Sequence, residues 1–389
     1  MAEHTSPRTE TGVSGSDPAA RSGPAHRHPA GRVRGWPRWA PVAALGWSLG
    51  YGVVGAACAA VGGAFPYAGM VGAPVAPLAT QFGTGPAWAA IVLAGFPAAA
   101  LGAAMLRRSP AARRVLTAAG ALVAALLLLA MIDVNLLTAL GYLPYGLVGQ
   151  VTGAPVGAAF RAAVLNWPFL HQLLCLAGGF LWLAATLSYA RTSRGACAAC
   201  GRDGTAEGWA APGAAARWGV YAVAVAAAVP LLYAFTRVAW WLGIPLGISR
   251  EFLRAGQENG MWTSGLFLAA FAVVGAVLTL GLVQRWGEVF PRWMVGLAGR
   301  RVPITLAVAP ASVVAVLVVV GGFAMWSGYA ELVGQGVSGD AEAAGMMALL
   351  PGLLFPVWGV ALGAATLAYY LRRRGACAVC GNGAPAAAG

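Results

Sequence analysis

Two Cys-x-x-Cys pairs are the part of this sequence with the clearest chemistry. Cys197 and Cys200 lie in RGACAACG, and Cys377 and Cys380 lie in RGACAVCG. A two-residue spacer lets both thiolates of a pair face one metal ion, and the glycine that follows permits the turn behind the second cysteine. Two such knuckles supply four thiolates, the ligand set of a closed tetrahedral zinc site. We therefore expect one structural zinc ion held by all four cysteines.

Two other interpretations of these cysteines stay open. The neighbouring arginines would lower a thiol pKa and favour a thiol redox pair, but no thioredoxin-like strand–helix–strand pattern surrounds them. The cysteines could also be reduced thiols that bind no ion. A permanent disulfide is the least favoured state, because the cytosol keeps thiols reduced.

A second candidate is a possible intramembrane polar pair, Asp133 and His171. Asp133 follows one apolar segment and His171 lies near the start of the next, so the two side chains could meet near the outer boundary. Ionisable groups at membrane depth are functional candidates, and a proton or solute relay would need such a pair. The alternative is that both are hydrated residues at the membrane surface.

Common catalytic motifs are missing from the sequence. It has no Walker loop, dinucleotide fingerprint, His-Glu-x-x-His or serine nucleophile elbow. No catalytic residue is assigned, and a non-enzymatic role is favoured while the question stays open.

The composition is typical of a membrane protein. Of 389 residues 59% are hydrophobic and only 10% are charged, against about 25% charged in soluble domains. The net charge of +13 would suggest nucleic acid in a soluble protein. Here the arginines sit in short loops, where they set orientation, so the expected partner is the lipid bilayer and not nucleic acid.

Long apolar segments must position the cysteines. The length of each apolar segment is close to the ~20 residues that a helix needs to cross a bilayer core. A backbone in lipid must satisfy its own hydrogen bonds, so these segments are expected to be helical. The eight predicted spans are 39–63, 86–106, 115–132, 169–190, 218–236, 263–283, 303–325 and 350–371. The fold class is therefore an all-α integral membrane protein with eight transmembrane helices.

Arginine placement predicts the orientation. With the N-terminus inside, the outer side holds only Arg161, Arg237, Arg250 and Arg254. This positive-inside bias predicts a plasma-membrane protein with both termini and both cysteine pairs in the cytoplasm.

The ending AATLSYARTSRGACAACG at 184–201 recurs as AATLAYYLRRRGACAVCG at 364–381. Shorter matches keep the same order, so we predict two tandem four-helix repeats in the same orientation, as in parallel-repeat transporters. The predicted divisions are a disordered tail at 1–36, a first repeat at 37–201, a linker at 202–217, a second repeat at 218–381 and a tail at 382–389.

The connecting segments carry three further predictions. Residues 64–85 and 133–168 are expected to be long outer loops, and 247–257 a short surface helix. Residues 284–302 are expected to lie at the membrane interface. The stretch Trp-Gly-Glu…Pro-Arg-Trp…Gly-Arg-Arg-Val-Pro at 286–303 resembles multi-pass membrane proteins of high-GC Gram-positive (actinobacterial) type. That resemblance implies a polytopic membrane protein and no particular activity.

Three functions are compatible with these patterns. The favoured one is a non-enzymatic membrane protein, such as a scaffold, whose halves are joined by a four-cysteine zinc clasp. The second is a small-solute transporter with a site between the halves, along a path lined by Asp133, His171, Pro97 and Pro310. The third is a membrane thiol-disulfide oxidoreductase that uses the cysteine pairs.

Overall fold

The computed structural model describes residues 35–60, 66–67, 70, 76–107, 112–204, 208–334 and 349–383. Within these residues the protein is all-helical, and its only β feature is an isolated bridge between Val289 and Arg301. Most of the predicted tail at 1–36 lies outside the described residues, as do 64–65, 68–69 and 71–75 of the predicted loop at 64–85 and 384–389 of the predicted C-terminal tail. The described remainder of the predicted loop includes a short helix at Leu78–Gln81.

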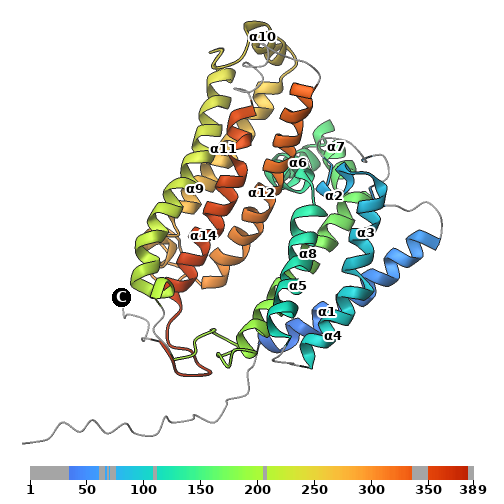
Figure 1. Ribbon diagram of the computed structural model, residues 1–389. Helices are drawn as coiled ribbons and strands as arrows, with labels where there is room; N and C mark the ends of the chain where they lie inside the picture. Colours follow the sequence, from blue (N-terminus) through green and yellow to red (C-terminus); the bar gives the residue numbers. More distant parts are fainter. Residues whose placement is uncertain are drawn as a thin grey trace, which may run out of the picture.

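The chain forms two groups of helices side by side, joined at one end by the cysteine segments (Figure 1). The first group consists of α1 (Trp36–Ala60), α2 (Leu78–Gln81), α3 (Thr84–Ala94), α4 (Phe96–Leu106), α5 (Arg113–Ala125), the π-helical turn η1 (Leu126–Ala130), α6 (Val134–Thr152), α7 (Pro155–Val164) and α8 (Trp167–Thr192). The second group consists of η2 (Gly208–Ala210), α9 (Pro212–Trp241), α10 (Arg250–Glu258), α11 (Met261–Leu280), η3 (Arg285–Gly287), α12 (Ile304–Gly334) and α14 (Phe355–Arg373).

Seven helices of the described chain are long and apolar enough to cross a membrane. They are Trp36–Ala60, Thr84–Leu106, Arg113–Ala130, Trp167–Thr192, Pro212–Trp241, Met261–Leu280 and Ile304–Glu331. They match the first seven predicted spans within a few residues. The eighth prediction, 350–371, falls on α14, a 19-residue helix whose last turn carries Arg372 and Arg373 and which is not among the seven. An eighth span stays a prediction.

Two proline positions behave differently. The second span is divided between α3 and α4, and Pro97 occupies the first turn of α4, where its missing N–H costs no helical hydrogen bond. Pro310 instead lies inside the continuous helix α12.

The prediction of a loop at 133–168 is wrong, because this segment forms the helical hairpin α6–α7. Its glycines and prolines suggested turns. Two of those glycines instead allow helix contact: a Cβ on Gly149 would lie 2.6 Å from the backbone nitrogen of Gly157. The composition therefore reflects close helix packing. The prediction of a short helix at 247–257 is confirmed by α10, whose first turn is capped by Ser249.

Helix neighbours follow the same pattern in the two groups. In the first group, α8 packs against α1 and α5, while α4 packs against α1. In the second group, α14 packs against α9 and α12, while α11 packs against α9. The groups meet where α6 contacts α12 and α11.

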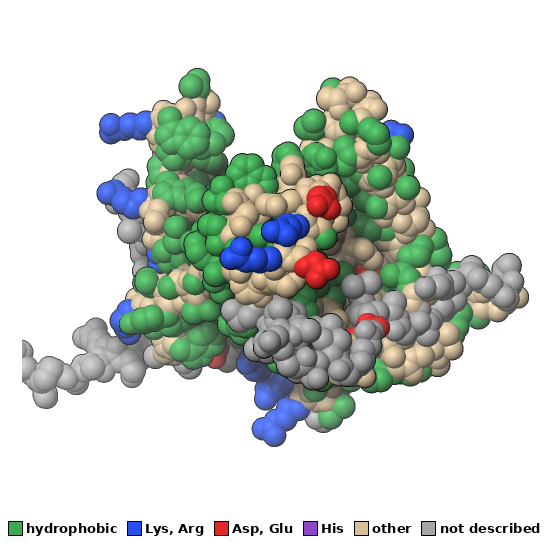
Figure 2. Space-filling view, turned by 90° about the horizontal axis from the view of Figure 1, so that it is seen from above, with side chains coloured by type: hydrophobic (Ala, Val, Ile, Leu, Met, Phe, Trp, Pro, Cys, Tyr) green, Lys and Arg blue, Asp and Glu red, His purple; other side chains and the backbone are tan. Residues whose placement is uncertain are grey.

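Large apolar side chains remain exposed along the flanks of the molecule. Examples are Val53, Val92, Leu122, Phe235 and Val360, each more than half exposed. Seen from the α10 end, hydrophobic side chains cover much of the flanks and charged side chains are few (Figure 2). Such continuous apolar surface is stable only in contact with lipid or another apolar partner.

The segment predicted to lie at the membrane interface, 284–302, forms η3 and a tight hairpin closed by the Val289–Arg301 bridge. It packs against the end of α14, where the Arg372 guanidinium lies 2.7 Å from the Glu288 carboxylate. Trp293 and Val295 are 77% and 97% exposed. Contact with a membrane interface stays a prediction for this segment.

Candidate metal centre

The four predicted ligands come together at one end of the molecule. The first Cys loop (residues 195–203) follows α8, and the second Cys loop (residues 375–383) follows α14. The Sγ atoms of Cys197 and Cys377 are 3.9 Å apart, and those of Cys200 and Cys380 are 3.5 Å apart. All four Sγ atoms lie within 4.8 Å of one another. Residues separated by 180 positions thus form one cluster.

Each Cys loop is built by the same two backbone hydrogen bonds. In the first loop, the N–H of Gly201 donates to the Cys197 carbonyl at 2.7 Å, and the N–H of Cys197 donates to the Arg202 carbonyl at 2.9 Å. In the second loop, Gly381 donates to Cys377 at 2.7 Å and Cys377 donates to Asn382 at 3.0 Å. These bonds close each loop into a tight turn that directs both thiols of a pair to one side.

Glycine is required at the turn that closes each loop. Gly201 has φ +77° and Gly381 has φ +73°, a left-handed conformation that side-chain-bearing residues rarely adopt. The glycine after the second cysteine, noticed first as sequence, therefore has a conformational role in both loops.

The sulfur spacing fits a single tetrahedral ion. Zn–S bonds of about 2.3 Å at tetrahedral angles place the sulfurs about 3.8 Å apart. The two cross-loop distances, 3.9 and 3.5 Å, lie on either side of that value. The cysteine side chains could therefore hold a metal ion with little rearrangement, and four soft thiolates favour zinc or iron over hard cations.

The surroundings shift the pKa values of the thiols in different directions. Burial raises the pKa of Cys200 to about 12, although the backbone N–H of Arg202 donates to its sulfur at 3.4 Å. Burial also opposes ionisation of Cys377, but backbone hydrogen bonds from Cys380 and Val379 and a bond from the Cys200 thiol outweigh it. The pKa of Cys377 is lowered to about 7. Burial raises the pKa of Cys380. A bound metal ion would displace the remaining thiol protons.

Two arginines connect the loops to each other. Arg202 of the first loop donates to the Gly375 and Asn382 carbonyls of the second, both at 2.9 Å. Arg374, which ends α14, donates to the Cys200 carbonyl of the first loop at 3.2 Å. Sequence reasoning noted the arginines near the cysteines but missed this bridging. A bulky cation beside each Cys-x-x-Cys was the only available signal.

A third arginine supports the first loop alone. Arg191 on α8 is 9% exposed and donates to the carbonyls of Ala198 and Ala199 at 3.3 and 3.0 Å. Its guanidinium also lies 5.4 Å from the centre of the Trp36 ring. Together these arginines place positive charge at the Cys loops, where it would help to balance the negative charge of metal-bound thiolates.

The second candidate pair, Asp133 and His171, lies at the opposite end of the first group. Both side chains are 1% exposed, so the alternative that they are hydrated surface residues is wrong. The Asp133 carboxylate caps α6 by accepting from the Asn135 N–H at 2.7 Å, and it also accepts from the Gln172 amide at 2.9 Å. Asp133 therefore holds η1, α6 and α8 together.

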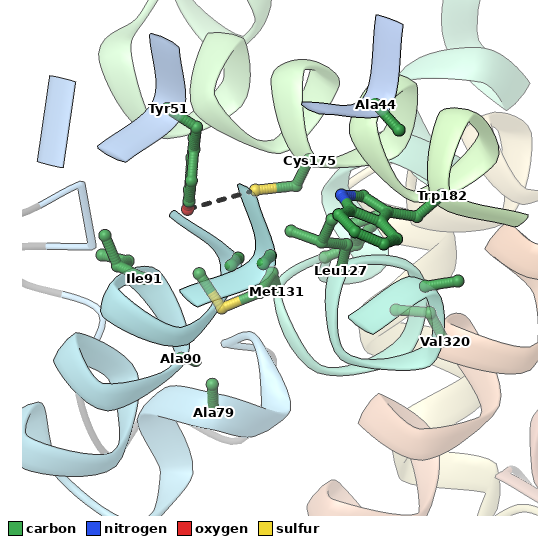
Figure 3. Packing of buried hydrophobic residues seen from close by; sticks show 14 of the residues in the cluster. Ala44, Tyr51, Ala79, Ala90, Ile91, Leu127, Met131, Cys175, Trp182 and Val320 are labelled. Atoms are coloured by element: carbon green, nitrogen blue, oxygen red, sulfur yellow. Dashed lines mark hydrogen bonds between the residues drawn. The ribbon is translucent and has the colours of Figure 1, made fainter. Parts of the chain in front are cut away.

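His171 has different partners. Its Nε2 lies 3.0 Å from the Tyr51 hydroxyl, and its ring meets Tyr67 edge-on, with centroids 5.0 Å apart. Tyr51 in turn approaches the Cys175 sulfur at 3.7 Å (Figure 3). Asp133 contacts Gln172 of α8, and His171 is the residue before Gln172, so the two polar contacts are adjacent. A proton or solute relay between Asp133 and His171 stays a prediction. Sequence reasoning missed Tyr51, Tyr67 and Cys175, which come from three separate segments.

No protein-family model, no curated protein and no solved structure matches this chain.

Proposed function

We propose that this chain is a non-enzymatic, eight-helix plasma-membrane protein whose two tandem repeats are held together by one zinc ion on the cytoplasmic side. The observation that carries the proposal is the cluster of four sulfurs within 4.8 Å, two from each repeat. Zinc is the favoured ion because a complete set of four thiolates leaves no open coordination position, which is typical of structural zinc sites.

The repeat organisation has three lines of support. The two endings at 184–201 and 364–381 are similar in sequence. The two groups have the same order of helix neighbours, and the two Cys loops have the same backbone hydrogen bonds. Matching order and matching neighbours are expected when one unit has been duplicated with its orientation kept. In this scheme α14 corresponds to α8 and is the eighth span.

The orientation rests on charge. Arg161 of α7, Arg237 near the end of α9, and Arg250 and Arg254 of α10 belong to the end opposite the Cys loops (Figure 1). Most other arginines flank the Cys-loop end, which by the positive-inside rule faces the cytoplasm. In that reducing compartment the cysteines stay available as metal ligands.

The test is the metal content of the detergent-purified full-length protein, measured by elemental mass spectrometry. We expect about one zinc per chain, lost in both Cys197→Ser and Cys377→Ser, because one ion needs ligands from both loops. Cys58→Ser is the matched control, since Cys58 is a free thiol outside the cluster, and it should keep its zinc.

Other outcomes would change the assignment. Iron in place of zinc would keep the clasp and replace its ion, because both metals accept four tetrahedral thiolates. Loss of metal in only one of the two serine variants would contradict a shared site. Metal-free protein with reactive thiols would contradict the clasp and favour the membrane thiol-disulfide oxidoreductase.

One observation favours the small-solute transporter as a second candidate. A pocket of about 350 Å³ lies between the groups, lined mostly by α6 and α7, with Ser264 of α11 on its other side. Asn135, Thr138 and Tyr142 give it polar groups. Asp133, His171, Pro97 and Pro310 are not among its lining residues, so the path expected from sequence is not the one this pocket offers.

Cysteine labelling would test that candidate. In a background with Cys58 replaced, Thr138→Cys should add to that background's labelling by a membrane-impermeant thiol reagent, from one side of sealed vesicles, if the pocket opens to water. Labelling equal to the background from both sides would contradict a solute path through this pocket.

A further inference from the structure

A second pocket, of about 270 Å³, lies beside the Cys loops at the end of the membrane-spanning helices. Four arginines line it: Arg191 and Arg194 from the end of α8, Arg202 from the first Cys loop and Arg374 from the end of α14. Asp203 is the only carboxylate among its lining residues. The pocket therefore has a large excess of positive charge.

Backbone carbonyls help to hold three of these arginines in place. Arg191 donates to the carbonyls of Ala198 and Ala199, Arg202 to those of Gly375 and Asn382, and Arg374 to those of Cys200 and Ala210. A carbonyl oxygen orients a guanidinium without cancelling its charge. The positive charge is therefore pre-organised before any ligand arrives.

Arg194 differs from the other three. It is exposed and follows the end of α8, and its Nε donates to the Ala190 carbonyl of that helix at 2.9 Å. That bond leaves its terminal nitrogens available for a bidentate contact with an anion, the geometry that guanidinium groups prefer with phosphate.

The remaining wall of the pocket is apolar and aromatic. It is formed by Leu367, Tyr370 and Leu371 of α14 and by Trp209. Leu367 is 42% exposed and lies farther into the helix than the arginines. A basic rim above an exposed apolar helix surface matches a molecule with an anionic head and an apolar body, whereas a free anion would gain nothing from the leucines.

We propose that this pocket binds the phosphate group of an anionic phospholipid, with the lipid chains along α14. The site goes beyond the zinc clasp but adjoins it, since Cys200 also lines the pocket. A zinc ion with four thiolates carries a net double negative charge. Together with Asp203 it would still leave the four arginines in excess, so the pocket stays cationic with or without the ion.

Native mass spectrometry of the detergent-purified full-length protein would test the proposal. The probes are phosphatidylglycerol, zwitterionic phosphatidylcholine of the same chain length, and inorganic phosphate. We expect one phosphatidylglycerol per chain to bind at least fivefold more tightly than phosphatidylcholine. Each arginine near a membrane surface strengthens the binding of anionic lipid by about 1 kcal/mol, which is about fivefold in affinity. Inorganic phosphate should not displace the lipid at equal concentration.

Arg194→Gln should weaken phosphatidylglycerol binding about fivefold. Arg300→Gln is the matched control, because Arg300 is an exposed arginine at the same end of the molecule and does not line the pocket. Equal binding of both lipids, displacement by inorganic phosphate at equal concentration, or an equal effect of the two substitutions would overturn the proposal. The zinc content of the same samples distinguishes failure of this site from failure of the clasp. The comparison of the two lipids uses the unsubstituted protein, so it tests the proposal even if a variant does not fold.

Discussion

The two Cys loops have the same cysteine frame but different supports. Both close with the same backbone hydrogen bonds and the same left-handed glycine. Arg191 supports the first loop, whereas the equivalent position 180 residues later is Leu371. Arg202 of the first loop reaches across to the second, whereas its equivalent is Asn382. The two loops therefore share the turn that carries the cysteines, whereas the arginine contacts of the first loop have no counterpart at the equivalent positions of the second.

The other ends of the two groups differ more. The first group buries Tyr51, His171 and Cys175 in polar contact. At this end the second group instead buries Trp240, Ile248, Leu253 and Trp262, and its two indoles donate to backbone carbonyls. The two groups therefore share the backbone geometry of their Cys loops, whereas the residues buried at their opposite ends are of different types.

Metal removal tests the shared part of this comparison and has the largest expected effect. With a chelator, the Gly201 and Gly381 amides should lose hydrogen-exchange protection together, by roughly 100-fold, the factor for an ion present at about 100 times its dissociation constant. Amides in the middle of α8 and α14 should stay protected. Loss of protection in one loop only would mean that the loops do not share an ion.

Arg202→Asn tests the unshared part, because it gives the first loop the residue of the second. It removes the guanidinium bonds to Gly375 and Asn382, and loss of such support for ligands costs about tenfold in metal affinity. Competition with a chromogenic chelator would measure the change.

Asn382→Ala is the matched control for that variant. It keeps the backbone carbonyl that accepts from Arg202 and should leave metal affinity unchanged. If both substitutions weaken the site equally, the loops are braced symmetrically and the comparison fails.

Tyr51→Phe tests the buried polar contacts around His171 in the first group. It deletes the hydroxyl 3.0 Å from His171 Nε2 in a buried site, and an unsatisfied buried group costs about 1–3 kcal/mol. The thermal midpoint should fall while zinc content stays the same. Tyr221→Phe, at a position 75% exposed, should change neither quantity. A lower zinc content in Tyr51→Phe would show that the two ends are coupled.

The sequence was sufficient for the parts of this protein that depend on short-range patterns. Apolar runs located seven helices that are long and apolar enough to span a membrane, and the two Cys-x-x-Cys pairs located the four cysteines that cluster and could hold a metal ion. Both signals lie within about twenty residues and have direct physical meanings, bilayer thickness and the reach of two thiolates around an ion.

Long-range contacts could not be predicted in the same way. The α6–α7 hairpin looked like a loop because glycines that permit helix contact have the same composition as glycines that form turns. The neighbours of His171 come from α1, the segment before α2 and its own helix. The bridging role of Arg202 depends on how the two loops face each other, which no local pattern specifies.

Arg191→Leu has the smallest expected effect and gives the sharpest test of asymmetry, because it makes the first loop resemble the second at the position of Leu371. The bonds to Ala198 and Ala199 are lost, but the second loop shows that the same turn closes without them. We therefore expect only about 1 kcal/mol of loss, or about fivefold in metal affinity. Hydrogen exchange should quicken in the first loop more than in the second. Leu371→Arg, the reverse change, should leave affinity unaltered, since the second loop is already held by Arg202. A gain of affinity from Leu371→Arg would mean that the second loop lacks support that the first one has.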